Sequence, residues 1–281
     1  MERVTWLLGV ATFHILSASA VQAHDTGRIV CTDPVQDMGT RNWGCKTPPL
    51  RGWTTTEKCV WRCLCAGGMA DLRHVQHKET FLSESFLSTV MFASPYKDAL
   101  THRGVQIIGA RFAEPVDLSD GVLPRRVVLS HSTFESGIRL RRVSSEGLLA
   151  LRDSKILGAA NFSFSRLYQV ELGGTELQSL AIASTIVEKQ LVLLAAKISG
   201  HANFFTTRFN DSVYLNEVEV GSLEMVRASI RGDLHLRGAS LGRADLRGVE
   251  IEGSLWLGDN KRDKRCRLWV PVILGRDFRI F

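Results

Sequence analysis

An 11-residue repeat runs through the chain from Gly104 onward and limits the folds open to it. Each unit follows the pattern x-Φ-x-Φ-x-x-s-x-Φ-x-x, in which Φ is apolar and s is small. Fourteen units follow one another, each beginning ten or eleven positions after the last, and a partial unit begins at Ser254. Unit positions 2, 4, 7 and 9 are apolar in all but eight cases, and those eight are Gly, Ser or Thr. This regularity indicates stacked, equivalent units. The units start at Gly104, Pro115, Arg126, Gly137, Leu148, Ala159, Gln169, Ser179, Gln190, His201, Ser212, Ser222, Asp233 and Arg243.

The spacing within a unit predicts strands. Positions 2 and 4 alternate apolar and polar, as do positions 7 and 9, so each unit holds two short strands with a corner between them. A helical repeat needs a longer unit, and leucine-rich repeats need about 20–29 residues with an Asn or Cys ladder that this chain lacks. A strict hexapeptide solenoid needs units that are multiples of six, which these are not. A stacked β-solenoid remains, in which the small residue at position 7 lets backbones approach.

Four segments near the end of the repeats carry a family resemblance: Ala228-Ser-Ile-Arg-Gly232, Ala239-Ser-Leu-Gly-Arg243, Ala244-Asp-Leu-Arg-Gly248 and Val249-Glu-Ile-Glu-Gly253. They resemble pentapeptide repeats, whose pattern is A-(D/N)-L-x-x. The match is good over residues 222–253 and degenerate over 104–221, where most units hold an extra residue. The resemblance implies a mainly β fold, a right-handed quadrilateral β-helix with four sides per coil. Two units would then form one coil of about 20–22 residues, giving about seven coils at a spacing of about 4.8 Å.

Stacking predicts which residues share an outer face. Position 3 of every second unit lies on one side of the coil, and this side is largely apolar. It ends in an aromatic row, Tyr214, His235 and Trp256, which is the candidate binding site for a sugar, peptide or protein because an exposed apolar strip needs a partner. The alternative is that the C-terminal tail or the cysteine-rich segment covers this row as a cap.

The segment before the solenoid predicts export. Residues 1–23 have Arg3 before an apolar run and end in Val21-Gln22-Ala23, the form of a signal peptide cleaved after Ala23. Residues 24–79 form a cysteine-rich segment, and the six cysteines of the chain are disulfide candidates of undetermined pairing. A metal site at Cys59, Cys63 and Cys65 is the alternative, although this spacing is not that of a zinc knuckle. The candidates are Cys31, Cys45, Cys59, Cys63, Cys65 and Cys266.

Two shorter regions flank the repeats. Residues 80–103 predict a helical connector of one or two short helices, with Ser83 as an N-cap. The repeat domain then spans residues 104–258. Residues 259–281 form a basic tail, and most of the formal charge of +6 belongs to it. This tail predicts contact with an anionic membrane surface or, alternatively, a solvated cap. Its cations are Lys261, Arg262, Lys264, Arg265 and Arg267.

The sequence favours a role without catalysis. It contains no phosphate loop, nucleophile elbow, zincin motif or dinucleotide fingerprint, and no cofactor or metal ion is expected. We expect an exported scaffold or protein-interaction module, periplasmic or secreted. A protein of the cell envelope that binds carbohydrate through the aromatic row is the alternative, and a β-helix enzyme acting on polysaccharide is disfavoured. Some pentapeptide-repeat proteins mimic DNA, but the solenoid here is nearly neutral, so a nucleic-acid role is disfavoured.

Overall fold

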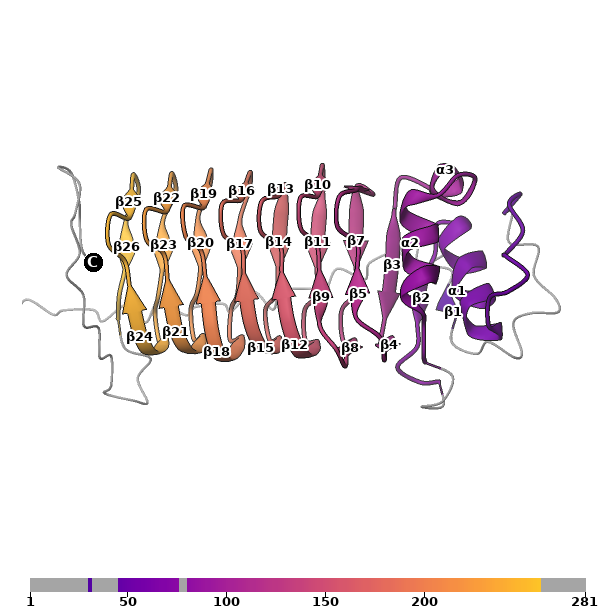
Figure 1. Ribbon diagram of the computed structural model, residues 1–281, viewed down its shortest axis with the longest axis horizontal. Helices are drawn as coiled ribbons and strands as arrows, with labels where there is room; N and C mark the ends of the chain where they lie inside the picture. Colours follow the sequence, from indigo (N-terminus) through magenta and orange to yellow (C-terminus); the bar gives the residue numbers. More distant parts are fainter. Residues whose placement is uncertain (1–29, 32–44, 76–79, 259–281) are drawn as a thin grey trace, which may run out of the picture.

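The computed structural model describes residues 30–31, 45–75 and 80–258. Over this part of the chain, short parallel strands wind into a right-handed β-solenoid of about seven coils (Figure 1). The structure therefore confirms the fold class that the repeat predicts. Helices gather at the N-terminal end of the rod, and those described are α1 (Thr55–Cys65), α2 (Glu84–Phe92) and α3 (Tyr96–Ala99).

The described strands form three parallel sheets, each running the length of the rod. Sheet 1 has the order β1 (Val30–Cys31), β2 (Met69–Asp71), β3 (Val105–Ile108), β7 (Arg126–Val128), β11 (Leu148–Ala150), β14 (Gln169–Glu171), β17 (Leu191–Val192), β20 (Val213–Tyr214), β23 (Leu234–His235) and β26 (Leu255–Trp256). Sheet 2 contains β4 (Arg111–Phe112), β5 (Val116–Asp117), β8 (Thr133–Phe134), β9 (Ile138–Arg139), β12 (Lys155–Asn161), β15 (Glu176–Ala181), β18 (Lys197–Asn203), β21 (Glu219–Glu224) and β24 (Ser240–Asp245). Sheet 3 contains β6 (Val122–Leu123), β10 (Ser144–Ser145), β13 (Arg166–Leu167), β16 (Ile186–Val187), β19 (Arg208–Phe209), β22 (Ser229–Ile230) and β25 (Glu250–Ile251).

Each coil has four sides, although there are three sheets. Strand β12 pairs with β8 through Lys155 and Ile156, and with β9 through Ala160 and Asn161, so sheet 2 covers two sides of the coil and bends between them. Sheet 1 is the first side, the two halves of sheet 2 are the second and third sides, and sheet 3 is the fourth. Register partners in successive coils are separated by twenty to twenty-two positions along the chain, as the resemblance implies.

The core is a column of apolar side chains inside the coils. Unit positions 2, 4, 7 and 9 point inward, and all but five of the residues at these positions are buried. One of the five is Gly121. The other four lie on the second, third and fourth sides of the last coil, where no described strand pairs beyond β24 and β25: Ala239, Leu241, Ala244 and Ile251.

Every unit turns through one residue in the left-handed backbone region. Position 6 has a positive φ in all fourteen units, at the corner between the strand at positions 2–4 and the strand at positions 7–9. Glycine occupies this position in four units, at Gly109, Gly174, Gly238 and Gly248. The other ten units place a side chain in this strained conformation, as at Thr206 with φ 52° and Ala195 with φ 54°.

A column of buried hydroxyl groups joins neighbouring coils beside these turns. The Ser165 hydroxyl donates to the Leu140 carbonyl at 2.9 Å, and the Thr185 hydroxyl donates to the Phe162 carbonyl at 3.0 Å. These carbonyls belong to position 4 of the preceding coil, where the turn gives them no strand partner. Where position 7 is Ser or Thr, the residue therefore does more than let backbones approach, since its hydroxyl satisfies a buried polar group.

The cysteine-rich segment contains a helix that the sequence analysis did not predict. Helix α1 begins at a capping box in which Thr54 and Glu57 exchange hydrogen bonds. The buried Glu57 carboxylate also accepts from the Ser83 backbone at 2.9 Å, and Ser83 caps α2 as predicted. Trp61 is fully buried in an aromatic cluster with Trp53 and residues of α2 and α3. This segment therefore packs as an apolar cap on the first coils.

Candidate binding surfaces

The predicted aromatic row forms a stack on the first side of the rod. Tyr214, His235 and Trp256 are register partners in β20, β23 and β26. The Tyr214 and His235 rings lie 4.6 Å apart with planes 9° from parallel. The His235 and Trp256 rings lie 5.8 Å apart with planes 3° from parallel. The structure thus brings the three side chains together along the rod axis.

The rings offer mainly their edges to solvent. Each face between two rings is covered by the neighbouring ring, and the Arg237 guanidinium lies 4.6 Å from the centre of the Trp256 ring. The three residues are half-buried, and 19% of the His235 side chain is exposed. Further along the same row Ala150 is fully buried. A ligand on this side would therefore meet ring edges and a cation, in contrast to the open faces on which sugars stack.

Asp233 fixes the polar edge of this stack. Its carboxylate accepts from the Trp256 indole at 3.3 Å and lies 3.7 Å from His235 Nε2. Burial lowers the pKa of His235, and Asp233 opposes this effect only in part because Arg237 also disfavours the imidazolium. His235 is therefore a neutral ring at neutral pH, which suits its place between two aromatic rings.

A groove of about 780 Å³ follows the second side across five coils. Its outward position-8 row alternates in charge, with Lys155, Glu176, Lys197 and Glu219 at one residue per coil. Lys155 Nζ lies 3.4 Å from Glu176 in the next coil. The sequence shows this row at a fixed repeat position, but only the paired register places it in a groove.

A polar cluster on the third side was missed by the sequence analysis. His201 Nδ1 lies 2.8 Å from the Ser222 hydroxyl, and His201 Nε2 lies 3.3 Å from the Glu224 carboxylate. Arg243 and Asp245 complete a hollow of about 330 Å³ around them. The repeat pattern alone predicts a solvated His201, because the partners of this side chain depend on the length of each coil, which varies by up to two residues.

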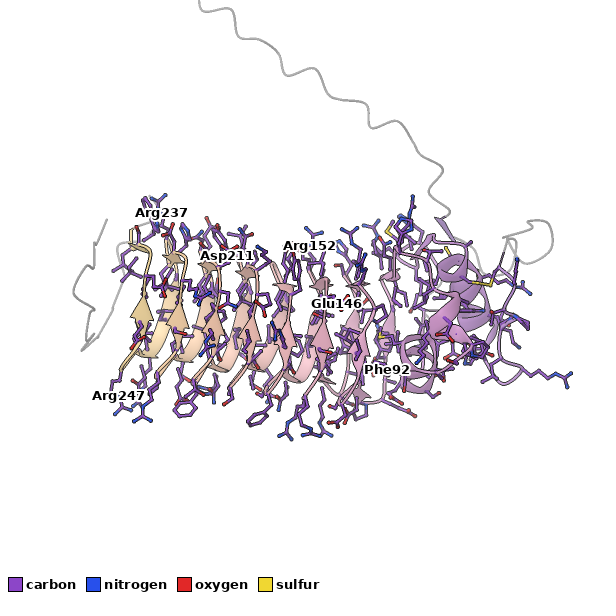
Figure 2. The ribbon with its side chains drawn as sticks, turned by 90° about the horizontal axis from the view of Figure 1, so that it is seen from above. Phe92, Glu146, Arg152, Asp211, Arg237 and Arg247 are labelled. Atoms are coloured by element: carbon purple, nitrogen blue, oxygen red, sulfur yellow. A yellow bond between two sulfur atoms is a disulfide. The ribbon has the colours of Figure 1, made fainter. Side chains whose placement is uncertain are left out.

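Ion pairs between coils occupy many of the other charged side chains. Arg142 binds Asp120 of the preceding coil through two hydrogen bonds, and Arg166 lies 2.8 Å from Glu188. Arg142 holds the pKa of Asp120 below its usual range through these bonds. Charged side chains stand along both edges of the rod, with Arg152 and Arg237 on one edge and Arg247 on the other (Figure 2). Such exposed pairs contribute little individually, but they recur at several junctions between coils.

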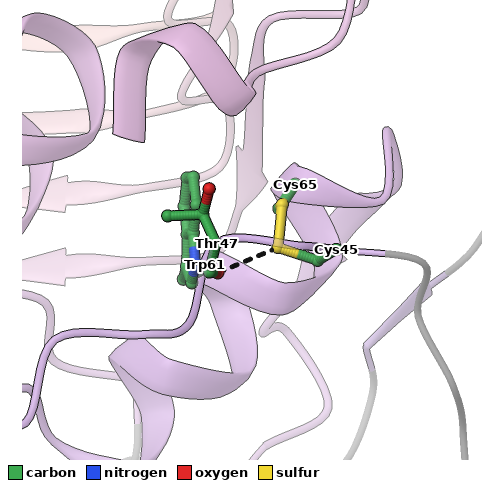
Figure 3. The surroundings of a disulfide bond; sticks show 4 residues. All are labelled: Cys45, Thr47, Trp61 and Cys65. Carbon is green, nitrogen blue, oxygen red and sulfur yellow. Dashed lines mark hydrogen bonds between the residues drawn. A yellow bond between two sulfur atoms is a disulfide. The ribbon is translucent and has the colours of Figure 1, made fainter. Parts of the chain in front are cut away.

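Two of the six candidate cysteines form a disulfide. Cys45 is bonded to Cys65 at the end of α1, with Cα atoms 5.4 Å apart (Figure 3). Beside it, the Trp61 indole donates to the Thr47 carbonyl at 2.9 Å. Because Cys65 is bonded to Cys45, it is not a thiolate ligand, and the three-cysteine metal alternative is wrong. Cys59 and Cys63 are buried in α1. Within the described residues no group of three or more His, Cys, Asp or Glu side chains could hold a metal ion.

Several sequence predictions fall outside the described residues. These are the signal peptide, the side chain of Cys31, Cys266 and the five cations of the basic tail. In the part of the chain that is described, none of the helices has the length and apolar character needed to cross a bilayer.

Comparison with known proteins finds no relative of this chain. No family model, curated protein sequence or solved structure matches the chain. The pentapeptide-repeat resemblance thus rests on its sequence segments and on the four-sided coil.

Proposed function

We propose that this protein is an exported, non-catalytic scaffold that holds a protein partner along the second side of its solenoid. The observation that carries this proposal is the long groove, which spans five coils and is lined by alternating charges. An open groove of this length suits an extended surface better than a small substrate, since small-molecule sites are clefts or cavities that bury most of the ligand's surface. Its charges lie at a fixed spacing because the coils are hydrogen-bonded throughout.

Export is supported by the disulfide. Structural disulfides persist in oxidising compartments, and Cys45–Cys65 ties down the cap of the solenoid. The expected location is the periplasm or the medium, with cleavage of the signal peptide after Ala23. Mass spectrometry of the exported protein under non-reducing conditions tests both points: the measured mass should correspond to a chain that begins at His24 and contains the disulfide. An intact Met1, or thiols at both Cys45 and Cys65, would contradict the proposal.

Site-specific photo-crosslinking tests the groove. A crosslinking amino acid replaces Gln178, an exposed residue of the groove, in the full chain expressed with its leader in a bacterial host. We expect a discrete crosslinked protein species. The matched control replaces Arg208, which is exposed on the fourth side, and should give none. Equal crosslinking at both positions, or none at either, would contradict a binding role for the groove.

A carbohydrate-binding role is the second candidate, favoured by the aromatic stack and its Arg237 cation. Paired Tyr214→Ala and Trp256→Ala substitutions should then lower retention on cell-wall glycans, because they remove the rings on either side of His235. The control is Val192→Ala, which alters the same row three coils from Trp256 and leaves the stack intact. Unchanged retention in the paired variant would end this candidate.

A further inference from the structure

Over its six residues from β8 to β24, the outward row on the second side is antisymmetric about its midpoint; Arg111 of β4 precedes this stretch. From β8 to β24 it reads Thr133, Lys155, Glu176, Lys197, Glu219 and Ser240, one residue per coil. When the row is read in the reverse order, each lysine falls at the position of a glutamate and each glutamate at the position of a lysine. The two hydroxyl residues, Thr133 and Ser240, exchange the end positions. The midpoint lies between Glu176 and Lys197.

A second copy of the chain is complementary to this row in one orientation. A two-fold axis that lies in the second face, perpendicular to the rod, sets two rods antiparallel with their grooves facing. Lys155 then faces Glu219 of the other copy, and Glu176 faces Lys197. Each pair occurs twice because the contact is isologous. In a parallel pair the charged row would instead face the neighbouring row, which holds Gln178, Ser199 and glycines.

The same two-fold operation places side chains of complementary size opposite each other in the neighbouring outward row, which contains Leu157, Gln178, Ser199 and Gly221. Leu157 is 62% exposed beside Lys155, a large apolar side chain in solvent. In the antiparallel pair it faces Gly221, which has no side chain, and Gln178 faces Ser199. The two rows thus agree on one register through independent properties, charge and volume.

The spacing of the charges also selects this partner. Coils follow at about 4.8 Å, so four charges span about 14 Å. Side chains on one face of a partner strand recur at about 6.6 Å, and a helix advances about 5.4 Å per turn. A second solenoid has the same repeat by construction and keeps all four pairs in register.

We propose that the chain forms an antiparallel two-fold dimer through the second side of its solenoid. This inference rests on the proposed function, since it names the partner of the same groove. The alternation also serves the stack within one chain, as the Lys155–Glu176 pair shows. Stabilising the stack within one chain would require neither hydroxyl residues at both ends of the row nor a glycine at the position that faces Leu157 in the dimer.

Sedimentation of the mature chain with charge variants tests the dimer. Wild type should be dimeric at roughly 10 μM in low salt and dissociate as salt is added. The Lys155→Glu/Lys197→Glu variant makes the row acidic, and Glu176→Lys/Glu219→Lys makes it basic; each alone should be monomeric. An equimolar mixture should restore a dimer. The fourfold exchange of all these charges keeps the alternation and should remain dimeric.

A variant at a single exposed residue distinguishes loss of the dimer from loss of folding. Leu157→Glu adds charge at an exposed site and should weaken the dimer at least tenfold, whereas Val122→Glu, at a residue 66% exposed on the fourth side, should not. A monomeric wild type at roughly 100 μM, a dimeric acidic variant, or equal effects of the two glutamates would each overturn the proposal. If Gln178 crosslinks to a different protein and the purified chain is monomeric, the groove still binds a partner and only the dimer fails.

Discussion

The strained turns show where single residues set the stability of the rod. Position 6 adopts the left-handed conformation in every unit, yet ten of fourteen units have a side chain there. An L-residue in this region costs about 1–2 kcal/mol relative to a relaxed backbone. No residue type marks the position, so the repeat pattern did not reveal it, and only the backbone shows it.

Replacing one of these residues by glycine should stabilise the protein. We expect Ala195→Gly, at φ 54°, to raise the free energy of unfolding by about 0.5–1 kcal/mol, since relief of strain exceeds the added freedom of the unfolded chain. Urea unfolding measures the change. Ala183→Gly is the control: it lies one residue before the equivalent turn position and should destabilise. A loss of stability in Ala195→Gly would contradict the strain argument.

His235 should respond to pH through its burial in the stack. Its pKa is lowered from 6.5, so the fold favours the neutral ring. The stabilisation is therefore complete above the unfolded pKa of about 6.5 and is lost as the pH falls through the lower folded pKa. NMR titration should show His235 protonating below the range of an exposed histidine.

A variant isolates this effect from the other histidines. In His235→Phe, which keeps an aromatic ring in the stack, the unfolding free energy should fall less on acidification than in wild type. Equal pH dependence of the two proteins would contradict a role for His235.

Among the elements, the strands were predictable and the N-terminal cap was not. Inward positions carry apolar residues at a fixed spacing, so the pattern specifies strand positions and their inner face. Helix α1 lies among cysteines, glycines and threonines, and its apolar face packs against residues far away in sequence. The signal available was the Thr54–Glu57 capping box, whose two members have the expected spacing at the start of the helix. The aromatic row was predictable from coil length, whereas the His201 cluster required the register between individual coils.

The hydroxyl column gives a prediction at the level of coil pairing. Thr185→Val removes the donor to the Phe162 carbonyl and leaves that buried oxygen unsatisfied. We expect a loss of about 1–3 kcal/mol in the free energy of unfolding. Valine fits the space, because Val143, Val218 and Val249 occupy the same unit position. The control Ile186→Val changes the adjacent, less buried residue by one methylene group and should cost less. Equal stability of Thr185→Val and wild type would show that the hydroxyl has no role.

The whole molecule should tolerate a change in the number of coils. Deleting residues 170–190 removes one coil and places Leu191 where Val170 was, its register partner. We expect a folded rod of lower stability, because stability in repeat proteins is a sum over units and interfaces. Circular dichroism and thermal unfolding measure it.

A deletion out of register is the control for the coil deletion. Removing residues 170–185 puts Ile186 at an inward position and Val187 at an outward one, which reverses the alternation in the strand. We expect this variant to lose its cooperative unfolding transition. If both deletions unfold alike, the equivalence of the coils is wrong.

The parallel hydrogen bonds between coils also determine how the rod would respond to pulling. Force applied to the C-terminal end of the solenoid loads β24, β25 and β26 first, since each coil is bonded to the one before it. Detaching one coil frees about 21 residues, so each rupture would lengthen the tether by about 70 Å. In a force spectrometer the rod would come apart as a series of evenly spaced peaks, one for each coil.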